Sequence, residues 1–246
     1  MTPIFLPGLC DPDAAATVRR HGHTAAAAAE QAEAVFSRLH DALTAAGGAA
    51  TDVCKITMQI TDRAYRQAIY GVLGRQLAGV FPVSTGLIVK GLPDPDALFQ
   101  LDAWAMAGGP HARLRRYRST DAPYGLNKQE FVCDFCMVVV AGRRIFLRGQ
   151  TGLGLNGVMV GLNDAGAQAR QAVDNVRVLL AQAGADLSHA VRLVTYVTDR
   201  AYLEPVLGVV QPAFAGTPAV ATELVVKGLA APEILMEIDV HAVLPA

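Results

Sequence analysis

The sequence predicts an α+β protein made of two tandem copies of one domain, each a mixed β-sheet with two helices on one face. Short motifs recur at one fixed offset, each copy alternates Ala-rich with β-branched segments, and the 246 residues suffice for two domains. The expected order is strand, strand, helix, strand, helix, strand, strand, and the first copy keeps only one of the two opening strands. That order is typical of helices packed on one side of a sheet.

The duplication is read from two motifs. The sequence T-D-R-A-Y occurs at Thr61–Tyr65 and again at Thr198–Tyr202. The sequence V-K-G-L occurs at Val89–Leu92 and again at Val226–Leu229. In both cases the second occurrence lies 137 positions after the first (61 to 198, 89 to 226). Unrelated segments would not keep one register over so long a stretch, so the two halves are copies of one unit.

The domain boundaries follow from this repeat. We expect a first domain at residues 1–108, a linker at 109–128 and a second domain at 129–246. The linker is rich in Gly, Pro and Arg and shows no helical or strand period. The second copy begins with a hairpin, Cys133–Val140 and Arg144–Arg148, around a turn glycine. The first copy keeps one such strand near Ile4–Leu6, so we expect it to be truncated at its N-terminus.

The first helix of each copy is predicted from its alanines and its hydrophobic spacing. It covers Ala25–Ala46 in the first copy and Ala165–Ala183 in the second, and a glycine follows each. In the first copy, Val35, Phe36 and Leu39 recur at helical intervals and predict a buried face.

The remaining elements follow in the same order in both copies. Val53–Thr61 and Ala190–Thr198 are rich in β-branched residues and read as strands. An aspartate after each strand suits the start of a second helix, which runs to about Leu77 or Phe214. Two strands close each copy: Val83–Lys90 with Leu98–Met106, and Val220–Lys227 with Ile234–Val243.

Composition and charge exclude several classes of protein. The formal net charge is −1, which gives no electrostatic reason to expect nucleic acid or an anionic membrane as a partner. No segment has the apolar length of a membrane span, and the N-terminus lacks the basic region of a signal peptide. Four cysteines are too few for a disulfide scaffold of this length. We therefore expect a cytoplasmic protein.

Each copy resembles the Rid family of reactive intermediate deaminases, also called YjgF-type proteins. The matching features are F-L-x-G-Q at Phe146–Gln150, a helix ending in A-G, a strand closing in T-D, and L-M-E-I-D at Leu235–Asp239. The resemblance implies a chorismate-mutase-like fold and homotrimers with ligand clefts between subunits. It also implies hydrolysis of enamines and imines derived from amino acids, with release of ammonia and without metal or organic cofactor.

The family's functional residues map onto this chain with several departures. A last-strand Glu that positions the attacking water corresponds to Glu237 in the second copy and Gln100 in the first. The Arg that clamps the substrate carboxylate falls at Ser84 and Ala221, which are both uncharged. The small hydroxyl residue before G-Q is replaced by Arg148. We expect Arg148, Phe135, Gln150 and Thr222 to bind the substrate, although Phe135 is alternatively a residue of the core.

The residues themselves leave alternatives open. On an alternating strand Glu237 shares a face with Asp239, where it is either a general base or a charged residue on a solvated or interface face. Arg148 is either a guanidinium that clamps a carboxylate, or a surface arginine at a strand end or in an interface ion pair. Lys90 and Lys227 occupy equivalent places and could form Schiff bases, although exposed lysines are the rule.

The cysteines and histidines do not predict a metal site. Cys133 and Cys136 form a lone C-x-x-C on a predicted strand, and zinc would need two further ligands that the sequence does not supply. Ordinary buried cysteines are the better interpretation. The six histidines show no metal-ligand spacing beyond His21 and His23.

These observations predict a Rid-like hydrolase acting on a small imine, enamine or related C–N substrate. The second copy would carry the chemistry, with Glu237 activating water and Arg148 holding an anionic group, while the first copy would be the scaffold. The alternative is a non-catalytic Rid-like module that binds a small metabolite or a partner enzyme. We expect a homotrimer of tandem chains, with six domains in two stacked rings.

Overall fold

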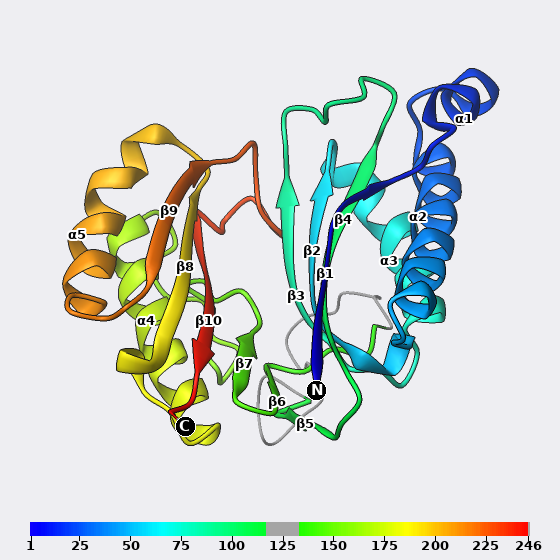
Figure 1. The fold of residues 1–246 in the computed structure, drawn as a ribbon. Coiled ribbons are helices and arrows are strands. Elements are labelled where there is room, and N and C mark those ends of the chain that lie inside the picture. The colour runs from blue at the N-terminus through cyan, green and yellow to red at the C-terminus, as the bar shows by residue number, and fades with distance from the viewer. Residues whose placement is uncertain (117–132, 246) are drawn as a thin grey trace.

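The computed structural model describes residues 1–116 and 133–245, which form two domains lying side by side. Figure 1 shows their β-sheets facing each other in the middle of the molecule and their helices on the two outer sides. Each sheet combines parallel and antiparallel neighbours. The predicted α+β class, with two tandem domains of mixed sheet and helices on one face, is confirmed.

The first domain has a four-stranded sheet in the order β1-β4-β2-β3, in which β2 and β3 are parallel and the other neighbours antiparallel. Its elements are β1 (Thr2–Cys10), α1 (Ala14–His21), α2 (Ala25–Ala45), β2 (Val53–Ile60), α3 (Arg66–Gln76), β3 (Val83–Ile88) and β4 (Phe99–Ala107).

The second domain repeats this order and adds two strands at one edge of the sheet, which reads β5-β6-β7-β10-β8-β9. Its elements are β5 (His111–Leu114), β6 (Val138–Ala141), β7 (Arg144–Leu147), α4 (Ala165–Gln182), β8 (Ala190–Val197), α5 (Leu203–Ala213), β9 (Val220–Val225) and β10 (Met236–Val243). The strand β1 of the first domain pairs with β4 as β7 pairs with β10, so the hairpin of the second domain corresponds to a single strand in the first.

The long helices begin where the sequence predicts because their first turns are capped. The hydroxyl of Thr24 accepts a hydrogen bond from the backbone N–H of Ala27 at 3.2 Å, and Asp164 does the same for Ala167 at 2.9 Å. The aspartate after β2 has a slightly different role from the expected one. Asp62 caps a short 3₁₀ turn, Arg63–Tyr65, that leads into α3.

Three local expectations are corrected. Helix α1 was not predicted from the sequence. Residues 111–114, inside the expected linker, form β5, which pairs with β6. Residues 133–137, expected as strand, precede β6 without regular structure. The rest of the predicted linker, residues 117–128, lies outside the described residues.

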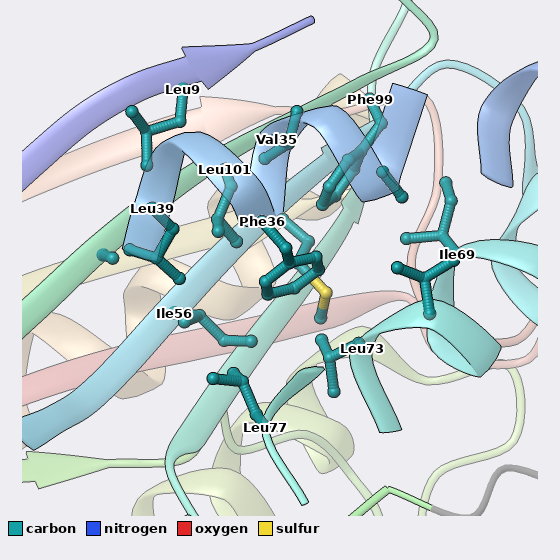
Figure 2. Packing of buried hydrophobic residues seen from close by; sticks show 14 of the residues in the cluster. Leu9, Val35, Phe36, Leu39, Ile56, Ile69, Leu73, Leu77, Phe99 and Leu101 are labelled. Atoms are coloured by element: carbon teal, nitrogen blue, oxygen red, sulfur yellow. The ribbon is translucent and has the colours of Figure 1, made fainter. Parts of the chain in front are cut away.

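The core of the first domain lies between its helices and the outer face of its sheet. Val35, Phe36 and Leu39 of α2 are fully buried, as their helical spacing predicts. Figure 2 shows them together with Ile56 of β2 and Phe99 of β4 in one cluster. Burying such side chains is the main favourable contribution to folding, at roughly 1.5–3 kcal/mol each.

The opposite face of each sheet meets the other domain. The backbone N–H of Gly149, just after β7, donates to the carbonyl of Ser84 in β3 at 3.2 Å. Further along, Ile88 and Gly228 exchange two backbone hydrogen bonds. A hydrophobic cluster from both domains packs beside these contacts: Cys54, Val83, Met106, Cys136, Val139, Ala141 and Phe146. The second domain thereby buries β3, and this junction positions the candidate site.

Among the helices of residues 1–116 and 133–245, none combines the length and the apolar character that crossing a membrane requires.

Candidate functional site at the domain junction

Two carboxylates of β10 point from the second domain toward the first. Glu237 and Asp239 share the face of the strand that meets the other domain, while Met236 and Ile238 face the helices of their own domain. Glu237 is only 5% exposed and Asp239 is fully buried. The predicted alternation along this strand is therefore confirmed, and Glu237 lies on a face between the two domains, not on a solvated one.

Asp239 is held by two residues of the first domain. Its Oδ2 lies 2.9 Å from the Nζ of Lys55 in β2 and accepts a hydrogen bond from the Thr85 hydroxyl in β3 at 2.9 Å. Lys55 also donates to Thr85 Oγ1 at 3.2 Å and to the Leu147 carbonyl at 3.0 Å. Both charged side chains of this pair are fully buried. The two domains therefore share one buried network.

The hydrogen-bond geometry sets the charge of Lys55. The single proton of the Thr85 hydroxyl goes to Asp239, so this oxygen accepts from Lys55. Lys55 therefore serves three acceptors, which requires the three N–H groups of an ammonium. Burial lowers the pKa of Lys55, and the nearby carboxylate of Asp239 opposes that effect. We infer a buried ion pair at neutral pH.

The two carboxylates have opposite pKa shifts. Although burial disfavours the ionised form of Asp239, the ammonium of Lys55 holds its pKa below the ordinary value. Burial raises the pKa of Glu237 to about 7, and the negative charge of Asp239 adds to this rise. The positive charges of Lys55, Arg148 and Arg66 oppose it. Asp239 thus stays ionised, while Glu237 gains and loses its proton near neutral pH.

Two arginines act electrostatically on Glu237, and the guanidinium of each lies over an aromatic ring. The guanidinium of Arg148 lies 5.2 Å from the centre of the Phe135 ring, which packs edge-on against Tyr70 of α3 at 6.2 Å. Arg66, also in α3, lies over Tyr70 and donates to the carbonyl of Ala230 in the other domain at 2.7 Å. The sequence-predicted Arg148 and Phe135 are therefore brought together with Glu237, and the first domain adds a second cation.

The other two predicted substrate-binding residues are placed differently. Gln150 is fully buried, and its backbone exchanges hydrogen bonds of 2.8 Å with Ile238, which joins the segment after β7 to β10. Its side chain donates to the Arg148 carbonyl at 2.6 Å. Thr222 is exposed on the edge strand β9, two strands from Glu237. The hydroxyl at the junction comes instead from Thr85, its equivalent in the first copy.

Sequence reasoning missed Lys55, Thr85, Arg66 and Tyr70. One signal was available, because Lys55 interrupts a strand whose other residues are mostly apolar. A second signal was the repeat itself. The positions of Arg66 and Tyr70 hold Leu203 and Leu207 in the second copy, and this loss of polarity indicates a special role in the first.

The remaining candidates lie elsewhere. Lys90 and Lys227 are exposed, which does not favour Schiff-base chemistry. Cys133 and Cys136 are free thiols, and burial raises the pKa of each to about 12, so they are poor nucleophiles. Within residues 1–116 and 133–245, no three His, Cys, Asp or Glu side chains are grouped so that they could hold a metal ion.

Gly149 allows Glu237 to lie against the backbone. A Cβ on Gly149 would overlap Oε1 of Glu237 and would lie 3.0 Å from Thr85 Oγ1. We predict that Gly149→Ala keeps the fold but displaces Glu237. Any hydrolysis of the imine or enamine substrates expected from the sequence should then fall on the order of a hundredfold. Steady-state kinetics measure the fall in rate, and thermal unfolding checks that the fold is kept. Gly91→Ala, where the added methyl meets open space, is the control, and equal rates for both variants would contradict the prediction.

Comparison with known proteins places this geometry in a family. A family model described as Endoribonuclease L-PSP matches residues 128–244. A solved chorismatase has a TM-score of 0.70 at 17% sequence identity, covering 87% of this chain and 70% of its own. This likeness shows that the two-domain fold extends over most of the chain. A search of curated proteins found no significant match.

Two single-domain structures match about half of the chain. A Mycobacterium tuberculosis member of the YjgF/UK114 family is 27% identical over 55% of this chain and 100% of its own, with a TM-score of 0.44. A Rid-family protein from Yersinia pestis is 34% identical over 44% of this chain and 86% of its own, with a TM-score of 0.39. With the family match to the second domain and the internal repeat, this chain belongs to the YjgF/Rid family as a tandem two-domain member.

Proposed function

We propose that this protein is a hydrolase for a small imine, enamine or related C–N substrate, with Glu237 as the catalytic acid and base. The observation that carries the proposal is the pair of buried carboxylates on β10. Asp239 is neutralised by Lys55, and the pKa of Glu237 is raised to about 7. A group that exchanges a proton near neutral pH suits general acid–base catalysis.

The chemistry needs one group that first accepts and then donates a proton. Ionised Glu237 would take a proton from water while the water oxygen bonds to the imine carbon and the C=N electron pair moves to nitrogen. The carboxyl would then return the proton to nitrogen, which gives a neutral carbinolamine. Glu237 would next take the proton of its hydroxyl group and pass it to nitrogen, so that the C=O bond forms as the C–N bond breaks and ammonia leaves. An enamine would first accept a proton on carbon from the neutral Glu237 carboxyl, which gives the protonated imine and leaves Glu237 ionised; return of an N–H proton to Glu237 gives the imine. Neither sequence of steps requires an oxidant or a reductant.

An anionic substrate group would be held by the arginines of the junction. The uncharged Ser84 and Ala221 stand where the family's clamping arginine is expected. Arg148 and Arg66 both act electrostatically on Glu237, as Lys55 does. A bidentate arginine contact with a carboxylate contributes roughly 2–5 kcal/mol when desolvated, whereas a single hydroxyl contributes about 1 kcal/mol.

The decisive test is an assay on imines generated in situ by an amino-acid oxidase or a threonine dehydratase. We predict ammonia release at rates about tenfold to a thousandfold below those of a Rid protein that carries the clamping arginine, because the arginines here belong to other elements, Arg66 to α3 and Arg148 to the segment after β7. Arg148→Ala should lower the remaining activity, whereas Arg143→Ala, in the exposed β6–β7 turn, should not. Rates that match the relative's would contradict the prediction.

The same experiment addresses a non-catalytic role. If no imine is hydrolysed while a metabolite binds tightly, the binding module becomes the better account. Chorismate belongs among the compounds tested, because the fold neighbour that spans most of the chain is a chorismatase. We do not propose the ribonuclease activity in the family's description, since the net charge of −1 provides no attraction for RNA.

We also propose that the protein assembles as a homotrimer of tandem chains. The support is the exposed strand β9, which is the repeat of the buried strand β3. All six residues of β9 are exposed, among them Val220 at 72%, whereas the second domain covers β3. An exposed apolar edge strand is a surface that proteins usually cover.

Light scattering of the purified protein at micromolar concentration tests this assembly. The expected mass is three chains, and Leu224→Glu on β9 should reduce it. Val178→Glu on α4 is a matched control, because both side chains are 45% exposed. A monomeric mass for the unaltered protein would overturn the proposal.

A further inference from the structure

The chemistry at Glu237 depends on a residue that its own domain does not supply. Asp239 is two residues from Glu237 on the same strand face, so its Cα is about 7 Å away. The counter-ion of Asp239 is Lys55, which is anchored in β2 of the first domain. The Thr85 hydroxyl, on the neighbouring strand β3, donates to the same carboxylate oxygen. The first domain thus determines the charge beside Glu237.

Lys55 is not placed to bind a substrate. Its three N–H groups are directed to Asp239, Thr85 and the Leu147 carbonyl, and its side chain has no exposed surface. An anionic substrate group could be reached only by breaking one of these buried bonds. The function of Lys55 therefore has to pass through the residues that it holds.

We propose that Lys55 is a positioning residue for Glu237: its ammonium keeps Asp239 as the ionised member of the carboxylate pair, so that Glu237 is the member that exchanges a proton with the substrate. This inference rests on the proposed function of Glu237. It makes the first domain a working part of the site instead of a scaffold only.

The other charged groups around the pair do not replace Lys55. Arg192 occupies the repeat position of Lys55, but its Nη1 lies 3.5 Å from the other oxygen of Asp239 and its side chain is 35% exposed. His241 lies 3.6 Å from that oxygen, and burial lowers its pKa to about 3, so it is uncharged at neutral pH. Arg148 and Arg66 act on Glu237, and Tyr196 on β8 stays a neutral phenol because burial raises its pKa.

The test compares the pH dependence of kcat/KM in two opposite charge removals. If Glu237 must be ionised, kcat/KM of the unaltered protein rises with pH, and the midpoint of this rising limb lies near pH 7. Lys55→Met removes a positive charge and makes the carboxylates harder to ionise. It should therefore move the midpoint of this limb to higher pH, by on the order of one pH unit. Asp239→Asn removes a negative charge and should move the midpoint to lower pH by a similar amount. A purely structural role would lower rates without moving the limb in opposite directions.

Matched controls separate Lys55 from the general electrostatic field. Lys90→Met makes the same substitution at an exposed lysine and should leave the limb in place. Arg192→Met should shift the limb less than Lys55→Met does, and an equal or larger shift would overturn the proposal. The double variant Lys55→Met with Asp239→Asn removes both charges, and its limb should lie between those of the single variants.

A second readout does not need turnover. Carbon-13 NMR of Glu side-chain carboxyls follows the titration of Glu237 directly, and the resonance is assigned by its loss in Glu237→Gln. Opposite shifts of this titration in Lys55→Met and Asp239→Asn support the positioning role even if no imine is hydrolysed. Turnover with a Glu237 titration that neither variant moves would leave the proposed function intact and overturn this inference.

Discussion

Glu237→Gln is expected to reduce hydrolysis of imines by a factor of about 10² to 10⁴, the usual contribution of a positioned acid or base. The substitution preserves the size of a side chain that is only 5% exposed, but an amide neither accepts nor returns a proton near pH 7. Steady-state kinetics of ammonia release measure the loss. Thermal unfolding checks that the variant is folded.

Gln100 is the control that the chain itself provides. It occupies the position of Glu237 in the first copy, and Gln100→Ala should leave turnover within about twofold, because an amide cannot be the general base at neutral pH. Loss of activity in Gln100→Ala together with an active Glu237→Gln variant would mean that the chemistry belongs to the first domain.

Lys55→Met is expected to cost about 3–5 kcal/mol of unfolding free energy, which is typical when one member of a buried ion pair is removed. Asp239 would keep the Thr85 hydroxyl but lose the ammonium that neutralises it, in a place with no solvent exposure. Chemical denaturation at pH 7 measures the loss. Replacing both partners, as in Lys55→Met with Asp239→Leu, should restore much of it, because no uncompensated charge then stays buried.

The pH dependence of stability has a definite sign. The pKa of Asp239 is lower in the folded protein than its ordinary value, so the folded state releases this proton more readily than the unfolded chain. The stabilisation is therefore present above the ordinary Asp pKa and is lost as pH falls through the folded-state pKa. Unfolding in acid should show this loss, and Asp239→Asn should flatten the curve there. An unchanged acid limb in Asp239→Asn would contradict this explanation.

The site was predictable where function depends on position along a strand. Alternation and the matching motif predicted Glu237, and the structure places it at the domain junction with Arg148, whose guanidinium lies over the Phe135 ring. Thr222 was misplaced because the two copies are alike in sequence but not in surroundings. Only Thr85 of the first copy faces another domain, whereas Thr222 lies on an exposed edge.

The sequence by itself determined the repeat, the fold class and most element boundaries. Helical spacing, β-branched runs and caps are local, and each acts within a few residues along the chain. Only the tertiary structure decided how the halves meet. Thr85 and Asp239 are 154 positions apart, and no local pattern tells which face of one sheet covers the other. Their contact results from burying two domain surfaces together, and the charge state of Glu237 follows from that contact. A buried carboxylate stays ionised only beside a positive charge and otherwise takes up a proton.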